Sequence, residues 1–369
     1  MFTDGAEAPN GPDGPTFADL PRPLFLPDAT RAAIRAADPL AVAATGHRAM
    51  LCSAPHVMVS PGASVLKAAG GVKALMSWPG RLVSDSGGYQ IYSLSKSGNK
   101  LASIDDSGMK FRFSAKAKFR TLTPESSIDT QLAIGSDVAY CLDYCTSPTA
   151  PRAEQELSVR LTIDWARRCR QRFDAATADR DPDTRPKLFA VVQGGPFPDL
   201  RRQCAEALAE VGFDGYGFGG YPIDNGALVD AFAEMPALVP AGVSLHGLGV
   251  GTPENVVAGH GAGYDVFDCV LPTRNARRGV LYTRLDLDAT GTEITYKTAR
   301  MGDDSWFRAT GPVDPDCDCV MCTSYHAAYL AHLFRIEDSA AATLFTLHNL
   351  RFYARLMEAL GARAHHVVE

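Results

Sequence analysis

From residue 130 onward, short apolar runs alternate with amphipathic segments, and this order constrains the fold more than any other feature. Each apolar run has the length of a buried strand, and the segments between them have helical periodicity. A repeated strand–loop–helix order implies parallel strands. The expected strands are residues 139–142, 188–192, 216–218, 243–250 and 266–271, and the clearest helices are residues 153–173 and 199–211.

Polar residues and glycines stand where these apolar runs end. Asp85, Asp143, Gln193 and Gly220 each follow such a run closely. In a (β/α)8 barrel, the loops at the C-terminal ends of the strands build the active site. We therefore predict an α/β fold, a (β/α)8 barrel, with its site at that end. A doubly wound open sheet is the alternative, and it is disfavoured because no Gly-x-Gly-x-x-Gly follows a first strand.

The stretch 265–279 joins an acid in an apolar strand to a group of arginines. Asp268 stands between Phe267 and Cys269, where an unpaired charge would be costly. Pro272 is expected to end the strand, and three arginines follow at positions 274, 277 and 278. This pattern suits a catalytic carboxylate beside a site for an anionic ligand. The alternative is a capped aspartate next to a solvated run of charges.

The bulk properties bound the class of protein. A chain of 369 residues accommodates one large barrel with insertions, and we expect a single barrel domain over residues 21–369 after a flexible N-terminus, residues 1–20. No apolar run is long enough to span a membrane, and no signal peptide is recognisable. The net charge of −6 argues against broad, non-specific binding of nucleic acid. Nine cysteines without a secretion signal are typical of cytoplasmic thiols.

Three of those cysteines form a metal-binding pattern. Cys317, Cys319 and Cys322 have the spacing of thiolates that can face one tetrahedral ion, and His348 can complete the set. Four protein ligands leave no open position, which predicts a structural Zn²⁺. Spacing alone leaves His326 and His332 open as alternatives to His348. The other reading, three free thiols in a loop, leaves their close spacing without a reason.

Five motifs stand in a fixed order along the chain. They are Asp85-Ser-Gly-Gly-Tyr-Gln90, Val192-Gln-Gly-Gly195, Gly247-Leu-Gly-Val-Gly-Thr-Pro-Glu254, Phe267-Asp-Cys-Val-Leu-Pro-Thr-Arg274, and Cys-x-Cys-x-x-Cys with His348-Asn-Leu350. Together they resemble the tRNA-guanine transglycosylases, or queuine tRNA-ribosyltransferases, most closely the bacterial type. The resemblance covers most of residues 25–360. It implies a (β/α)8 barrel with a C-terminal zinc-binding subdomain at about residues 300–350, and commonly a homodimer.

The resemblance also implies an activity. The family exchanges guanine at the wobble position of certain tRNA anticodons for a 7-deazaguanine, which in bacteria is 7-aminomethyl-7-deazaguanine on the way to queuosine. By position in the motifs, Asp268 would be the nucleophile that forms a covalent ribosyl-aspartate, and Asp85 the general acid/base. Arg274 and Arg277 would contact the tRNA anticodon loop.

A base pocket follows from the same motifs. Tyr89 and Leu248 would stack on the two faces of the guanine or 7-deazaguanine ring. Asp143 would accept from the ring N1–H and the amino group, and Gln193 with the backbone N–H of Gly220 would meet the exocyclic oxygen. A flat ring needs stacking faces and a few in-plane partners, and this set supplies both.

The chain departs from the family pattern at two informative places. Cys52-Ser-Ala-Pro-His56 replaces a family Asn-Thr-Tyr-His that supports Asp85, and Ser53 can cover part of that role. Gly219-Gly-Tyr-Pro-Ile-Asp-Asn225 replaces Gly-Gly-Leu-Ala-Val-Gly-Glu. The Leu–Ala peptide of the family can flip, but a Tyr221–Pro222 peptide has no N–H to offer. We therefore expect a preference for an aminomethyl base, with a nitrile used poorly and queuine blocked by Ile223.

Three alternatives stay open. The first is a paralogue that uses another 7-deazaguanine, such as queuine. The second is one that modifies DNA or another position of tRNA. The third is a non-catalytic partner subunit of a heterodimer. Retention of both Asp85 and Asp268 argues against the third, because a scaffold has no use for a buried pair of acids.

Overall fold

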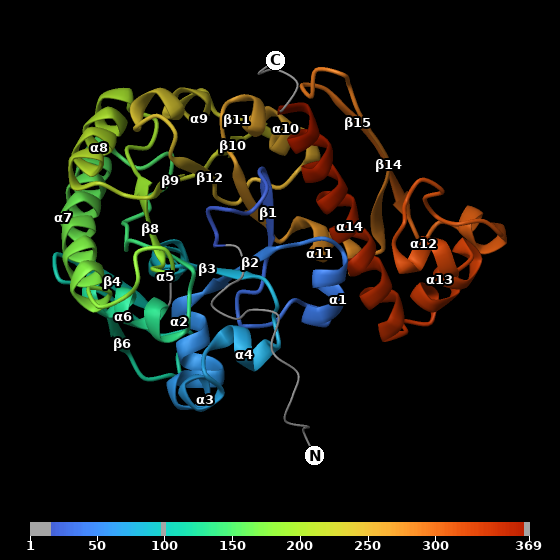
Figure 1. Cartoon of the computed structure of the whole chain (residues 1–369), viewed down its shortest axis with the longest axis horizontal. Coiled ribbons are helices and arrows are strands. Elements are labelled where there is room, and N and C mark those ends of the chain that lie inside the picture. The colour runs from blue at the N-terminus through green and yellow to red at the C-terminus, as the bar shows by residue number, and fades with distance from the viewer. Residues whose placement is uncertain (1–15, 97–100, 365–369) are drawn as a thin grey trace.

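The computed structural model describes residues 16–96 and 101–364. Its centre is a barrel of eight parallel strands in the order β1-β13-β12-β9-β8-β7-β3-β2 (Figure 1). The ring closes between its two end strands, where the Ala29 N–H donates to the Leu51 carbonyl at 2.7 Å. The strands are β1 (Leu24–Pro27), β2 (Ala49–Ser53), β3 (Arg81–Asp85), β7 (Val138–Tyr140), β8 (Lys187–Val192), β9 (Gly215–Phe218), β12 (Ser244–Gly247) and β13 (Val266–Cys269).

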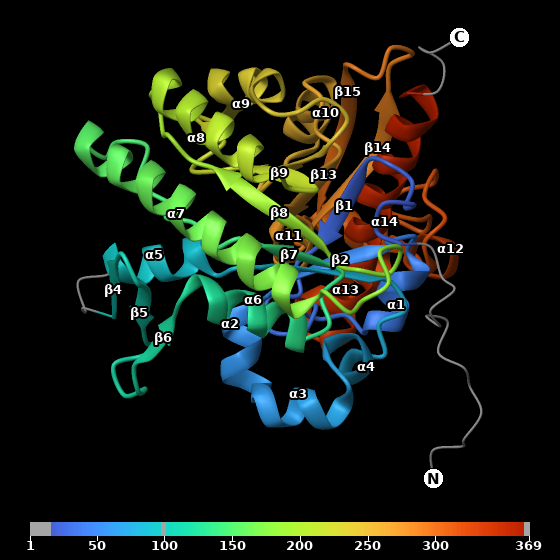
Figure 2. The ribbon, with the colours of Figure 1, turned by 60° about the vertical axis from the view of Figure 1, so that its left-hand side comes forward.

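Helices surround the barrel (Figures 1 and 2). Two of them begin where the sequence supplies a threonine cap and a proline. The Thr123 side chain accepts from the Ser126 N–H, and that of Thr252 accepts from the Asn255 N–H. The helices are α1 (Pro39–Ala44), α2 (Ala54–Val57), α3 (Ala63–Ala69), α4 (Val72–Met76), α5 (Gly88–Lys96), α6 (Pro124–Ala133), α7 (Arg152–Ala176), α8 (Pro198–Val211), α9 (Asp230–Glu234), α10 (Pro253–Gly261), α11 (Leu271–Ala276) and α14 (Ser339–Ala364), with short turns η1 (Met58–Gly62) and η2 (Met235–Leu238). None of the helices in the described part of the chain combines the length and apolar character needed to span a bilayer.

Three small antiparallel sheets are inserted between elements of the barrel or follow them. A three-stranded sheet of β4 (Ala102–Asp105), β5 (Gly108–Phe111) and β6 (Arg120–Leu122) lies between α5 and α6. A small ribbon of β10 (Ile223–Asp224) and β11 (Ala227–Leu228) follows β9, and a long hairpin of β14 (Val280–Leu287) and β15 (Ile294–Arg300) follows α11. Beyond it, η3 (Asp304–Arg308), α12 (Val320–Ser324) and α13 (Ala327–Arg335) pack on α14 around a separate apolar core (Figure 1).

The inside of the barrel is filled by side chains, as its parallel strands require. Tyr140, Phe189 and Val191 belong to one cluster there. Phe17 joins them with its ring at 6.3 Å from that of Phe189, so the folded body already includes residues before 21. Because Phe189 lies near the start of β8, Phe17 fills the end of the barrel opposite the strand ends that carry the site.

The predicted (β/α)8 barrel is confirmed, but several boundaries differ. The strand expected at 266–271 ends at Cys269, and Pro272 lies in the first turn of α11 rather than in a loop. Proline fits there because the first turn of a helix needs no N–H from it. Arg274 is therefore helical. The strand expected at 243–250 ends at Gly247, and two strands, β1 and β2, had no clear signal in the sequence.

Candidate active site

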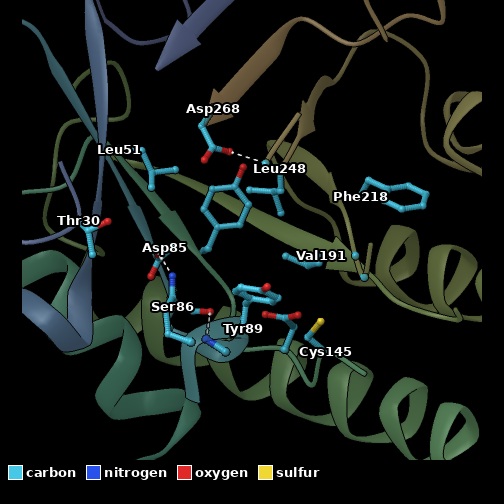
Figure 3. Close-up of a pocket in the computed structure, with 18 of the residues that line it drawn as sticks. Thr30, Leu51, Asp85, Ser86, Tyr89, Cys145, Val191, Phe218, Leu248 and Asp268 are labelled. Carbon is cyan, nitrogen blue, oxygen red and sulfur yellow. Dashed lines mark hydrogen bonds between the residues drawn. The ribbon is translucent and has the colours of Figure 1, made fainter. Parts of the chain in front are cut away.

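One cavity of about 310 Å³ opens at the C-terminal ends of the barrel strands (Figure 3). That volume is at the small end of the range for small-molecule sites. The cavity brings together residues that lie far apart in the sequence. Those predicted from the sequence that line it are Asp85, Tyr89, Asp143, Gln193, Gly220, Leu248 and Asp268.

Asp268 projects from β13 into the cavity with one of its two oxygens held (Figure 3). Its Oδ1 accepts from His246 Nε2 at 3.0 Å and from the Gly249 N–H at 3.0 Å. Since a carboxylate only accepts, Nε2 of His246 carries the proton, and the Tyr140 hydroxyl lies 2.6 Å from Nδ1, where it can donate. His246 and Tyr140 are buried, so the hydrogen bond between them is shielded from water, whereas Asp268 is partly exposed to the cavity.

Sequence reasoning missed His246 and Tyr140. Both lie inside the barrel on β12 and β7, at positions that no motif marks. The one available signal was a pair of polar side chains in otherwise apolar strands. Their geometry explains how a charge is tolerated at Asp268: two donors hold Oδ1 in place. The second oxygen, Oδ2, is left for a ligand.

Asp85 stands at the end of β3 and is half-buried. Burial raises the pKa of its carboxyl to about 7, and the Ser53 hydroxyl and the Gln90 amide oppose that shift in part. Gln90 Nε2 donates to Oδ2 at 2.9 Å, whereas Oδ1 is buried and has no hydrogen-bond partner among the described residues. A carboxyl that is close to half protonated at neutral pH, with one free oxygen, is suited to giving and taking a proton.

Asp143 and Gln193 form the polar wall of the cavity. Gln193 Nε2 donates to Asp143 Oδ2 at 2.7 Å, and Gln193 Oε1 is buried and accepts from none of the residues that the structure describes. Burial raises the pKa of Asp143 to about 6, while the Gln193 hydrogen bond opposes this. The absence of a side chain at Gly88 lets the Asp143 carboxylate pack against the start of α5, because a Cβ at Gly88 would lie 2.7 Å from Asp143 Oδ1. Buried polar atoms are nearly always paired, so the unpaired oxygens of Asp85 and Gln193 suit this cavity to a molecule with a polar edge.

Tyr89 and Tyr221 flank the mouth of the cavity. Tyr89 is 50% exposed and lines the cavity, and its ring meets that of Tyr221 edge to face at 6.0 Å. The expectation that Ile223 lines the space beyond the base is wrong. Ile223 lies in β10, paired with Leu228, because the chain leaves the cavity after Gly220 and forms the β10–β11 ribbon.

The two predicted tRNA-binding arginines lie outside the cavity on or next to α11. Arg274 is exposed. Arg277 is half-buried, and its Nη1 donates to the Thr273 carbonyl at 2.9 Å. Both follow the strand that carries Asp268, so they are close to Asp268 in sequence but lie outside the cavity that it lines. Their position at the rim is compatible with contacts to a polymer rather than to a base.

The four predicted metal ligands meet in one buried cluster. The Sγ atoms of Cys317, Cys319 and Cys322 lie 3.6, 3.4 and 3.4 Å from His348 Nδ1, and all four ligand atoms lie within 4.8 Å of one another. His348 Nε2 lies 2.8 Å from the Tyr282 carbonyl, which orients the ring so that Nδ1 faces the thiols. The cluster could hold a metal ion. Its histidine is His348, and neither His326 nor His332 belongs to it.

Comparison with known proteins agrees with this geometry. A family model described as queuine tRNA-ribosyltransferase matches residues 15–364. A queuine tRNA-ribosyltransferase of Aromatoleum aromaticum is 39% identical over 92% of this chain and 87% of its own length. Those of Solidesulfovibrio magneticus and Pseudoalteromonas translucida are 36% and 35% identical over 92% of this chain and 86% and 84% of their own lengths. With the barrel, the paired acids and the Cys₃His cluster, these matches show that the chain belongs to the queuine tRNA-ribosyltransferase family.

Proposed function

We propose that this protein is a tRNA-guanine transglycosylase, a pentosyltransferase that replaces guanine at the anticodon wobble position with 7-aminomethyl-7-deazaguanine in queuosine biosynthesis. The observation that carries the proposal is Asp268, held through Oδ1 with Oδ2 left for a ligand, in one cavity with the half-buried acid Asp85. Family membership supports the same activity. It is also the ground for proposing a cytoplasmic homodimer.

The chemistry follows as two displacements at ribose C1′. Asp268 Oδ2 attacks C1′, the bond from C1′ to guanine N9 breaks, and the departing base takes its electron pair together with a proton from Asp85. The product is a ribosyl ester of Asp268. The incoming base then gives a proton to the Asp85 carboxylate and attacks C1′, which releases Asp268. Two inversions leave the configuration of the ribose unchanged, as in retaining glycosidases.

Recognition of the base uses the polar wall of the cavity. Asp143 is placed to accept from donors on the pyrimidine edge of a guanine-like ring, and the Gln193 amide and the Gly220 N–H are placed for the exocyclic oxygen. Tyr89 and Leu248 supply the two faces between which the ring would stack. The unpartnered Gln193 Oε1 marks a place where the amide can turn when a base binds.

The 7-substituent would be read by the Tyr221–Pro222 peptide. Pro222 has no N–H, so only the Tyr221 carbonyl is available as a partner. The carbonyl of the next peptide, that of Pro222, accepts from the Val229 N–H at 3.0 Å, which ties Pro222 to the ribbon. An aminomethyl group can donate to the Tyr221 carbonyl, whereas a nitrile only accepts. The Tyr89–Tyr221 pair, rather than Ile223, would obstruct the larger side group of queuine.

Base exchange into one unmodified tRNA tests the function and its specificity together. We expect labelled guanine to exchange, with kcat/KM for the aminomethyl base at least about tenfold above that for the nitrile and queuine, since an unpaired buried acceptor costs roughly 1–3 kcal/mol. Pro222→Ala restores an N–H and should raise use of the nitrile without changing guanine exchange. Efficient use of the nitrile by the wild type would refute the specificity. Absence of guanine exchange, or exchange into DNA alone, would refute the function.

The rate of guanine release should depend on the protonation of Asp85. The first displacement needs the protonated acid, which prevails below its pKa of about 7. Release in a single turnover should therefore fall toward tenfold per pH unit above about pH 7. Asp85→Asn should lower release by about 10²- to 10⁴-fold and remove this pH dependence. An unchanged pH profile in that variant would show that another group is the acid.

We propose that the Cys₃His cluster holds a structural Zn²⁺. Three thiolates and one imidazole match the preferred ligands of zinc in closed tetrahedral sites. Bound there, the ion would supply cross-linking rather than catalysis, because four protein ligands leave no position for a substrate. Cys317, Cys319 and Cys322 would be tied to α14 through His348, and α14 also packs against β1 and α11 of the barrel.

A further inference from the structure

The three-stranded sheet β4–β5–β6 lies beside the mouth of the barrel. It is inserted between the C-terminal end of β3, which carries Asp85, and the start of α6, so the topology places it on the side of the site (Figure 2). At its base, Phe113 stacks on His56 with ring centroids 4.3 Å apart. His56 Nδ1 lies 2.9 Å from Ser53 Oγ, and Ser53 is paired with Asp85 in the barrel. The sheet is thus anchored next to the proposed general acid.

This insertion carries an excess of positive charge in an acidic protein. Five cations lie between residues 110 and 120, whereas the whole chain has a net charge of −6. They are Lys110, Arg112, Lys116, Lys118 and Arg120, and none forms an ion pair with an acid among the described residues. The acids of the sheet, Asp105 and Asp106, stand at its opposite turn, and Asp106 is bound by Arg160.

An exposed aromatic ring lies among these cations. Phe119 is 43% exposed. Lys110 Nζ and Arg112 Cζ lie 5.4 and 4.6 Å from the centre of its ring. Lys110 is exposed and is paired with Thr121 across β5 and β6, so the Lys110–Phe119 contact lies on the face of the sheet opposite to that of the buried Phe111. Free cations around an exposed aromatic ring are what proteins use to hold a nucleic-acid strand, by phosphate contacts and stacking.

We propose that this basic sheet surface, Lys110, Arg112, Lys116, Lys118 and Phe119, binds the phosphate backbone of the tRNA substrate, with Phe119 stacking on one of its bases or riboses. The inference rests on the proposed function, which makes tRNA the substrate. Arg274 follows the strand of Asp268, and the basic sheet surface follows the strand of Asp85. The tRNA would therefore be held on two sides of the cavity. A solvated run of charges explains the cations but not the exposed ring between them.

Paired variants test the surface on the full-length protein. In Lys116→Ala/Lys118→Ala, we expect KM for an unmodified tRNA transcript to rise roughly tenfold with kcat unchanged, and the dependence of log Kd on log salt to weaken by about two. Phe119→Ala should raise KM at least about fivefold, and Phe119→Trp should restore binding because it keeps the stacking face. Lys116→Arg/Lys118→Arg keeps the charge and should behave as wild type.

The matched control removes the same charge elsewhere. Arg180 and Arg202 are exposed and have no acid partner among the described residues, so Arg180→Ala/Arg202→Ala should leave KM for tRNA unchanged. Equal losses in both double variants, or KM within twofold of wild type in Lys116→Ala/Lys118→Ala, would overturn the proposal. If the wild type exchanged no base at all, the proposed function would fail. Measurements of tRNA binding and of its salt dependence would still show whether the basic sheet surface binds tRNA.

Discussion

The Asp268→Asn protein is expected to lose guanine exchange into tRNA by at least about 10³-fold while remaining folded. Asparagine has the shape of aspartate, and its Oδ1 can still accept from His246 Nε2 and the Gly249 N–H. The change removes the negative charge and the second oxygen, which is the atom proposed to attack C1′. An amide nitrogen is a poor nucleophile, so the covalent ribosyl ester should not form.

Trapping the ester separates this role from an effect on binding. Wild-type protein incubated with tRNA should give a covalent adduct under denaturing conditions, and Asp268→Asn should give none although its Kd for tRNA stays within about threefold. Asp265→Asn is the matched control on the same segment. Asp265 accepts from the Leu245 N–H and the Ser244 hydroxyl, a structural role, so its loss should reduce stability but not the activity of the folded fraction. A rate of guanine exchange in Asp268→Asn above about one per cent of the wild-type rate would disprove that Asp268 is the nucleophile.

Loss of one metal ligand is expected to have the largest effect on stability. Cys319→Ala should abolish stoichiometric zinc and unfold the region around α12 and α13, because an apparent binding free energy of about 10–16 kcal/mol is available from a structural zinc site. The apolar core of this region includes the ligand cysteines themselves, so it depends on the ion that would join them. Removal of zinc from the wild type by a chelator should have the same result.

Zinc content and thermal unfolding measure this effect. Wild-type protein should contain about one zinc per chain, and Cys319→Ala close to none. Two controls are available. His332→Ala removes an exposed histidine that spacing alone left as a possible ligand, and it should retain zinc. Cys169→Ala removes a buried cysteine of α7 that lies outside the cluster. This variant should lose only the small amount of folding stability that a new cavity costs. Full zinc content in Cys319→Ala would contradict the assignment.

Much of the site could be predicted because its residues stand at recognisable places in the chain. Asp85, Asp143 and Gln193 directly follow apolar runs, and parallel strands bring such ends to one face of a barrel. The Cys-x-Cys-x-x-Cys spacing likewise predicts three metal ligands, because residues so close in sequence must also lie close in space. His348 was harder, because its distance from the cysteines in space depends on how α14 packs.

Other features had no local signal. The strands β1 and β2 are short apolar runs in a region without clear alternation, and only their pairing with β13 and β3 identifies them. Pro272 predicted the end of a strand but belongs to the start of a helix, since proline suits both. Ile223 was expected beside the base, and the β10–β11 ribbon instead carries it out of the cavity.

By itself, the sequence determined the alternation of strands and helices after residue 130, the acids and amides at the strand ends, and the cysteines of the metal cluster. These depend on periodicity and short spacing, which are local properties of a chain. Only the tertiary structure decided that His246 and Tyr140 support Asp268, and that the basic sheet surface stands beside Asp85. Such contacts join residues on different strands, and the contact of Tyr140 with His246 joins residues more than a hundred positions apart. Only closure of the barrel brings these residues together.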